Sequence, residues 1–212
     1  MKKDIRENNS PVLISLLSSK IKVILIGGGA AAYIKSETFA MKGCQVYILS
    51  ENFIDSFDNI KDYSNVVLIK EKYDIQYIRD KHIVIIATNN RELNSIIKQH
   101  CRKLCKIYVD VTDSKGGNCI IPCHRSTENI SIGVNTKGVS PVTSVFIADK
   151  LINYIKKYDD FVEFSSKVRN SISEMKYRKI IMSFICTDDF YFFYKKGKAC
   201  IIIEMFYKWN NC

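Results

Sequence analysis

The sequence predicts an α/β protein that begins with a parallel β-sheet and ends in a helical module. Over the first half of the chain, short apolar runs alternate with segments that favour helix, as in parallel sheets with right-handed crossovers. Three consecutive glycines follow the first of these runs. Between Pro141 and Gly197 the chain contains neither glycine nor proline, which favours long helices in the second half.

The expected strands are short, continuous apolar runs, which is typical of strands covered on both faces. They are residues 22–26, 45–49, 66–69, 82–87 and 107–111. The expected helices between them are residues 30–42, 75–78 and 91–103. The first helix carries Ala31, Ile34, Thr38 and Met41 on one face and ends at Gly43, a residue that commonly terminates helices.

The chain changes character after the fifth strand. Two apolar runs, 119–121 and 130–134, are expected to add edge or antiparallel strands to the sheet. Ser140 and Pro141 then predict the start of a helix that runs to about residue 158, because proline is favoured in the first turn. We expect residues 141–212 to form a smaller helical domain.

Composition and charge limit the class of protein. The chain has 212 residues, 47% hydrophobic and 25% charged, which is enough to bury a core. No apolar run reaches the roughly 20 residues that span a bilayer, so no membrane association is expected. The charged start of the chain lacks the apolar segment of an export signal, and the expected location is therefore the cytoplasm.

The chain is basic, with 32 Lys and Arg against 22 Asp and Glu and a formal net charge of +10. Such an excess favours an anionic partner, whether nucleic acid, a membrane surface or a polycarboxylate. No run of six or more basic residues forms a nucleic-acid tail, so no nucleic acid is expected as a partner.

The eight cysteines do not predict a zinc site. The pairs Cys101/Cys105 and Cys119/Cys123 lack the tight C-x-x-C spacing of such sites, and we interpret them as reduced structural thiols. No metal site is expected.

The glycine triplet opens the motif G-x-G-x-x-A, formed by Gly27, Gly28 and Gly29 with Ala32 in the last position. The first glycine permits a tight turn, and the third lets the backbone approach a pyrophosphate at the helix start. A flexible turn is the alternative, but the predicted strand before the motif and the predicted helix after it favour dinucleotide binding.

A carboxylate near the end of the second strand normally binds the adenosine ribose, and Glu51 is the nearest candidate. No Lys or Arg adjoins Glu51 in the sequence to receive a 2′-phosphate, which favours NAD over NADP. The alternative is that Glu51 is a solvated loop residue.

Further motifs occur in an order that is typical of one family. They are the apolar lead 11–17, the glycine loop with Lys35, the Ala-Thr-Asn-Asn-Arg-Glu-Leu-Asn turn 87–94, the segment 110–113 followed by Pro122, and the Gly-Val-Ser-Pro segment 138–141. In this order they resemble the precorrin-2 dehydrogenases of siroheme synthesis, including the amino-terminal part of bifunctional siroheme synthases. The resemblance covers about residues 11–157 well and the remaining tail loosely.

This resemblance implies an NAD-dependent oxidation of precorrin-2 to sirohydrochlorin. In some family members the same protein also inserts ferrous iron, and ferrous or cobaltous ion is then a substrate. It also implies a homodimer with a Rossmann-type domain, a dimerisation region and a helical module. The expected boundaries in this chain are 1–112, 113–150 and 151–212.

The resemblance also implies the roles of individual residues. Asp113 matches the family's catalytic aspartate, a general base, although an ungapped alignment places Thr112 there; the apolar phase of Val109 and Val111 favours Asp113. The cofactor would be bordered by the three glycines and by Ala30, Ala31, Glu51, Asn52 and Thr88. The expected contacts to the substrate's carboxylates are Lys35, Arg91, Lys115, Arg125 and Lys137.

The chain departs from the family pattern at three points: Ile34 replaces an arginine, Lys137 replaces a glycine, and the spacing from Asp113 to Pro122 is one residue shorter. A second hypothesis therefore stays open, that of a catalytically silent sensor or partner module that binds a dinucleotide or a tetrapyrrole.

Overall fold

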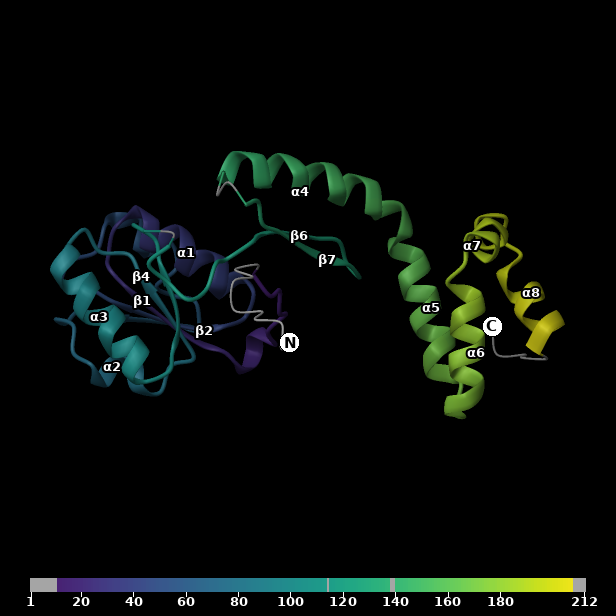
Figure 1. The fold of residues 1–212 in the computed structure, drawn as a ribbon, viewed down its shortest axis with the longest axis horizontal. Helices are drawn as coiled ribbons and strands as arrows, with labels where there is room; N and C mark the ends of the chain where they lie inside the picture. The colour runs from purple at the N-terminus through teal and green to yellow at the C-terminus, as the bar shows by residue number, and fades with distance from the viewer. Residues whose placement is uncertain (1–10, 114, 138–139, 208–212) are drawn as a thin grey trace, which may run out of the picture. The chain divides into compact units, whose positions relative to one another are not determined.

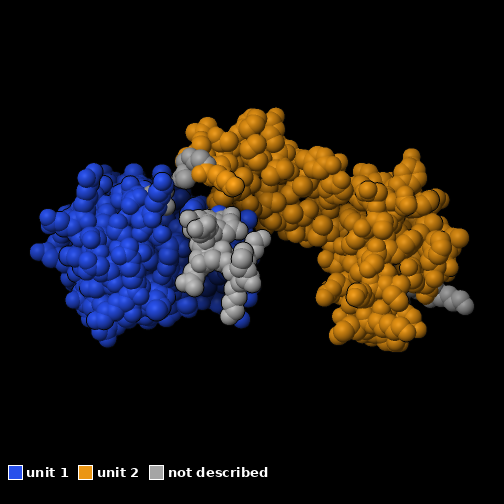
Figure 2. Space-filling view, in the orientation of Figure 1, with its two compact units in different colours: residues 1–121 blue, residues 122–212 orange. Residues whose placement is uncertain are grey.

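The computed structural model describes residues 11–113, 115–137 and 140–207. The chain divides into two compact units, residues 1–121 and 122–212 (Figure 2). The charged first residues, together with Gly138 and Val139 of the predicted helix-entry motif, lie outside the described part. The expected boundaries at 112 and 150, and a dimerisation role for the segment between them, stay predictions.

The first unit contains a five-stranded parallel sheet in the order β3-β2-β1-β4-β5 (Figure 1). This confirms the α/β fold class and all five predicted strands. Ile26 pairs with both Leu49 and Ile86, and Ile86 pairs with Asp110, so the carboxyl ends of four strands are in register. The strands are β1 Lys22–Ile26, β2 Gln45–Leu49, β3 Val66–Ile69, β4 Ile83–Ile86 and β5 Ile107–Asp110.

Helices cover both faces of this sheet and bury two apolar clusters (Figure 1). Val23 and Leu25 lie on the face covered by α1 (Ala30–Met41) and the short 3-10 helix η2 (Asp55–Asn59). Ile24 and Ile26 lie on the other face, covered by α2 (Gln76–Arg79) and α3 (Arg91–Lys103). A further 3-10 turn, η1 (Ser18–Lys20), precedes β1.

The face that α1 turns to the sheet differs from the one suggested by the sequence. The buried residues are Ala32, Ser36 and Ala40, whereas Ile34 is 58% and Met41 74% exposed. Small side chains let the helix backbone approach the strands closely, which larger residues on the same face would prevent. Ile34 and Met41 therefore face outward, whereas Tyr33 and Phe39 of the same helix pack at the edge of the buried cluster.

The second unit begins with an antiparallel hairpin of β6 (Cys123–Ser126) and β7 (Ser131–Val134), against which α4 (Pro141–Ile155) packs. The hairpin forms its own sheet, so the expectation that 119–121 and 130–134 extend the parallel sheet is wrong, and 119–121 is not a strand. Arg125 of β6 and Asp149 of α4 form an ion pair at 2.7 Å.

The predicted helix start at Pro141 is confirmed. Ser140 caps α4 by accepting a hydrogen bond from the Thr143 N–H at 3.3 Å, and Pro141 occupies the first turn, where its missing N–H has no intrahelical partner to lose. The helix passes into the 3-10 turn η3 (Lys156–Tyr158), close to the expected end.

The remaining helices are α5 (Asp159–Ser171), α6 (Met175–Ile185), α7 (Asp188–Lys195) and α8 (Ala199–Tyr207). They enclose a separate aromatic-rich cluster around Val168, Ile185, Phe190 and Ile203. Across the described residues, no helix combines the length and apolar character needed to cross a membrane.

Candidate active site

The glycine loop (residues 27–29) joins β1 to α1 and passes between the ends of β2 and β4. Gly27 has a φ of +131°, and a Cβ on it would lie 2.3 Å from the Ala87 carbonyl oxygen. A Cβ on Gly28 would lie 1.9 Å from the Asn52 carbonyl oxygen, whereas one on Gly29 would meet no atom within 4 Å. At Gly27 and Gly28 the loop therefore packs so tightly against the protein that a side chain would not fit. At Gly29 it leaves free space.

The open side of the loop is suited to an anion. α1 begins after Gly29 without a side-chain cap, so the N–H groups of its first turn retain their donor capacity. The helix dipole adds a partial positive charge at this end. Ala30 and Ala31 are exposed there, and the fully buried Ala32 packs with the sheet, as the motif predicts.

The loop after β2 brings Glu51 and Asn52 beside the glycine loop. The Ile54 N–H donates to the Gly28 carbonyl at 3.0 Å, and Ser50 Oγ donates to the Asn52 carbonyl at 2.7 Å. Lys72 Nζ lies 3.7 Å from Glu51 Oε1, and both side chains are well exposed. The sequence suggested no basic neighbour for Glu51; the structure supplies one from the segment after β3.

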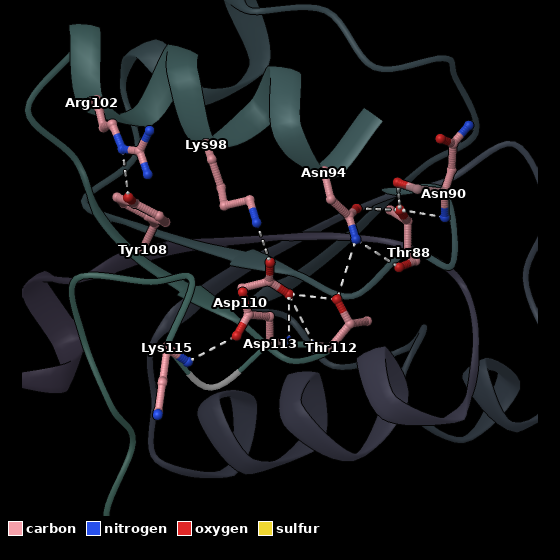
Figure 3. A network of polar contacts seen from close by, with 10 residues as sticks. All are labelled: Thr88, Asn90, Asn94, Lys98, Arg102, Tyr108, Asp110, Thr112, Asp113 and Lys115. Carbon is pink, nitrogen blue, oxygen red and sulfur yellow. Dashed lines mark hydrogen bonds and ion pairs between the residues drawn. The ribbon is translucent and has the colours of Figure 1, made fainter. Parts of the chain in front are cut away.

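A polar network lies at the carboxyl ends of β4 and β5 (Figure 3). Thr88, just after β4, donates from Oγ1 to Asn94 Oδ1, and Asn94 Nδ2 donates to the Thr88 carbonyl at 3.0 Å. Asn94 is buried on α3, whose first turn is capped by Asn90 Oδ1 accepting from the Leu93 N–H. These contacts attach the loop after β4 to the start of α3.

Asp110, the last residue of β5, is the buried charge in this network. Its Oδ1 accepts hydrogen bonds from the Thr112 N–H at 2.9 Å, Thr112 Oγ1 at 2.7 Å and the Asp113 N–H at 3.1 Å. Lys98 Nζ lies 3.0 Å from Oδ2, close enough for an ion pair although the pair lacks hydrogen-bond geometry. Burial raises the pKa of Asp110, but the hydrogen bonds from Thr112 and the positive charge of Lys98 outweigh burial, and the pKa is lowered overall.

The β5 turn (residues 110–113) presents Thr112 and Asp113 to a pocket of about 470 Å³. Both are exposed, and Asp113 Oδ1 accepts from the Lys115 N–H at 3.1 Å. The pocket brings together two sequence-predicted polar positions, Thr88 and Asp113, with a predicted cation, Arg91. Its lining residues are Thr88, Asn89, Arg91, Asn94, Lys98, Asp110, Thr112 and Asp113.

The five cations expected to contact substrate are distributed over both units. Arg91 lines the pocket, Lys115 is exposed close to Asp113 along the chain, and Lys35 is partly exposed on α1. Arg125 pairs with Asp149, and Lys137 is exposed after β7. The structure therefore assembles one of the five, Arg91, in the pocket that also holds Asp113.

Sequence reasoning missed Asp110, Asn94 and Lys98 as site residues. Asn94 and Lys98 lie four residues apart on one face of α3, and Asp110 follows a buried strand. The available signal was that two polar residues of one helix face are followed in the sequence by an aspartate at the end of a strand. Only the pairing of α3 with the β5 turn shows that the three residues meet.

The cysteines predicted to be structural thiols lie in the first unit and at the start of the second. Cys101, Cys105, Cys119 and Cys123 form no disulfide, and burial raises the pKa of the Cys101 thiol to about 12. In the part of the chain that the structure describes, no group of three or more His, Cys, Asp or Glu residues is placed to hold a metal ion.

The strand order is β3-β2-β1-β4-β5, so strands are added on one side of β1 and then, from β4 on, on its other side. The glycine loop lies at this switch point, which is the arrangement of a dinucleotide-binding α/β protein. Residues 14–123 match a family model described as "Putative NAD(P)-binding". The match covers more than half of the chain, and the protein belongs to this family.

Known relatives extend the comparison. The chain is 22% identical over 160 residues to a precorrin-2 dehydrogenase of Priestia megaterium, covering 74% of this chain and 78% of that protein. It is 25% identical over 154 residues to a siroheme synthase of Saccharophagus degradans, covering 72% of this chain. The match spans about a third (33%) of that synthase's length.

A solved structure shares the fold. The structure of SirC, a precorrin-2 dehydrogenase, superposes with a TM-score of 0.71 at 18% identity, over 92% of this chain and the whole of that one. This likeness extends the shared architecture into the helical second unit.

Proposed function

We propose that this protein is an NAD-dependent dehydrogenase that oxidises precorrin-2 to sirohydrochlorin in siroheme or cobalamin biosynthesis. The observation that carries the proposal is the placement of an open glycine loop and an exposed Asp113 at the same edge of one sheet. The substrate is suggested by the relative named precorrin-2 dehydrogenase, which this chain matches over most of its length.

The glycine loop and the start of α1 fit the pyrophosphate of NAD, because Gly29 leaves space and the helix start leaves N–H donors. Ala30, Ala31, Asn52 and Thr88 would border the cofactor, and Glu51 would bind the adenosine ribose. When bound, NAD⁺ supplies the acceptor for the hydride that the substrate loses.

Asp113 is the better candidate for the proton acceptor than Thr112. The Thr112 hydroxyl already donates to Asp110, whereas the Asp113 carboxylate is exposed to the pocket and accepts only from a backbone N–H on Oδ1 among its described contacts. A carboxylate oxygen of Asp113 can take the proton that the macrocycle releases on oxidation.

The charge of the chain suits a substrate that carries many carboxylates. With a net charge of +10, the protein attracts polyanions, and Arg91 places a cation in the pocket itself. We also propose Lys35, Lys115 and Lys137 as contacts to the substrate's carboxylates. The Arg125 guanidinium is held by Asp149, and we assign it the weakest role.

An anaerobic spectroscopic assay with precorrin-2 and NAD⁺ tests the proposal. We expect the wild type to form sirohydrochlorin and NADH, and Asp113→Asn to lower kcat by about 100-fold or more. Asp58→Asn, which removes an exposed ion pair with Lys61, is the matched control and should leave kcat unchanged.

Two outcomes would contradict the proposal. Unchanged oxidation by Asp113→Asn would show that Asp113 is not the base. NAD binding by the wild type with no turnover would instead support the silent binding module.

The homodimer and the metal ion remain part of the proposal. Val142, Phe146 and Tyr154 on α4 are exposed apolar side chains, and we propose that a second copy covers them. Repeating the assay with ferrous or cobaltous ion tests whether the protein also inserts a metal, which would then be a substrate. A cytoplasmic location stays a prediction.

A further inference from the structure

Asp110 is the last residue of β5, and its charged side chain is almost completely buried. Its side chain is only 1% exposed, and carboxylates are almost never buried to this extent unless they are paired. The residue lacks the exposure of Asp113, and its Oδ2 has the Lys98 ammonium at 3.0 Å and no hydrogen bond. Its role must therefore be sought in the groups that it contacts.

Those groups belong mainly to the turn that carries Asp113. One oxygen, Oδ1, accepts from two successive backbone N–H groups, those of Thr112 and Asp113, and from the Thr112 hydroxyl (Figure 3). A side chain that bonds the backbone two and three residues ahead imposes the local turn conformation. The backbone at Asp113 is thus tied directly to the end of the buried strand.

The other side of the turn is packed closely as well. The Gly116 N–H donates to the Asp113 carbonyl at 2.8 Å. A Cβ on Gly116 would lie 2.7 Å from Asp113 Oδ2 and 3.1 Å from Asp110 Oδ2. The carboxylates of Asp110 and Asp113 therefore both lie next to Gly116, where a side chain would collide with them.

Helix α3 supports this arrangement at two points. Lys98 places its ammonium 3.0 Å from Asp110 Oδ2 with only 21% of its side chain exposed. One turn earlier, Asn94 Nδ2 lies 3.4 Å from Thr112 Oγ1 while also donating to the Thr88 carbonyl. The same helix face therefore joins the loop after β4, beside the glycine loop, to the β5 turn.

We propose that Asp110 is a positioning residue that holds the β5 turn so that Asp113 faces the pocket, with Lys98 as its counterion. The role of Asp113 rests on the proposed function, but the hold of Asp110 on the turn does not. Asp110 acts through hydrogen-bond acceptance at Oδ1, and the ammonium is needed only because the acceptor is charged.

Two variants test this division of roles. Asp110→Ala removes the acceptor, whereas the double variant Asp110→Asn with Lys98→Met keeps an amide oxygen in its place and removes both charges together. Hydrogen exchange at the Thr112 and Asp113 amides reports on the turn without any activity. Anaerobic kinetics with precorrin-2 report on Asp113, and Asp58→Asn is again the control.

We expect Asp110→Ala to speed exchange of the two amides by about tenfold. It should lower kcat by about 100-fold, as a misplaced catalytic group does, while the NAD dissociation constant and the KM for precorrin-2 change less than about threefold. The double variant should restore slow exchange and most of kcat. A role confined to general stability would not produce this split between kcat and KM, nor the rescue.

Unchanged exchange in Asp110→Ala would overturn the proposal, and so would a double variant as defective as the alanine variant. If Asp110→Ala does not fold, the double variant decides, because it must then retain both slow exchange and kcat. If the wild type has no turnover, the proposed function fails, while the exchange measurements still decide whether Asp110 holds the turn.

Discussion

The glycine loop and the β5 turn lie at the same edge of the sheet but are built in opposite ways. The loop depends on missing side chains, since Cβ atoms at Gly27 and Gly28 would overlap backbone oxygens. The turn depends on a side chain that is present, since the Asp110 carboxylate accepts from two backbone N–H groups of the turn and lies beside the Lys98 ammonium. A binding loop for an anion needs exposed N–H groups, whereas a catalytic turn needs a defined direction for one carboxylate.

The largest effect is expected at the closed side of the glycine loop. Gly28→Ala would place a Cβ 1.9 Å from the Asn52 carbonyl oxygen, and a backbone neighbour cannot move aside cheaply. We expect the free energy of unfolding to fall by about 3 kcal/mol, with loss of NAD binding. Urea denaturation and NAD titration measure the two effects, and wild-type stability in this variant would refute the close approach.

Gly29→Ala is the matched change on the open side of the loop. Its Cβ would meet no atom within 4 Å, so the free energy of unfolding should change by less than about 1 kcal/mol. NAD affinity should nevertheless fall by about tenfold, because the methyl group occupies the side that the pyrophosphate approaches. Unaltered NAD affinity, measured by calorimetry, would place the cofactor elsewhere.

Acidification should distinguish the turn from the loop, because Asp110 lies in the turn, whereas the three glycines of the loop carry no ionisable side chain. The folded-state pKa of Asp110 lies below its unfolded value, so Asp110 contributes stability above pH about 4 and loses it as the pH falls further. The double variant at 110 and 98 has no such contribution to lose. The difference in urea midpoint between wild type and variant should therefore shrink from pH 6 to pH 3, and a constant difference would contradict the assignment.

The smallest effect is expected at Lys72, which lies beside Glu51 on the cofactor side of the sheet edge. Its ammonium partly neutralises the carboxylate that would repel a 2′-phosphate. Because the pair is exposed and screened, we expect Lys72→Gln to weaken NADP⁺ binding by only about threefold and NAD⁺ binding less. Equal changes in the two dissociation constants would show that Lys72 does not contact the ribose side.

The predictions that succeeded from sequence depend on local patterns. Each strand was a short apolar run, and the glycine motif lay between a strand and a helix, so periodicity and turn chemistry were sufficient. The helix beginning at Pro141 was likewise marked by its own cap, Ser140. The resemblance then supplied Asp113, whose exposed place on the pocket is compatible with the proposed role.

The errors arose where packing partners are distant along the chain. The side of α1 that faces the sheet is formed by alanines and a serine. Hydrophobicity alone cannot identify this side, because its residues fit there by their small volume. The run 119–121 is apolar enough for a strand but finds no strand partner, whereas the less apolar segment 123–126 does.

By itself, therefore, the sequence determined the α/β class, the order of the five strands along the chain and the glycine loop, because these follow from residues close together. Only the tertiary structure decided that Lys72 meets Glu51 and that Asp110 meets Lys98. Hydrogen bonds and ion pairs act over a few ångströms, and their partners come from separate elements whose approach is decided by the packing of the whole unit.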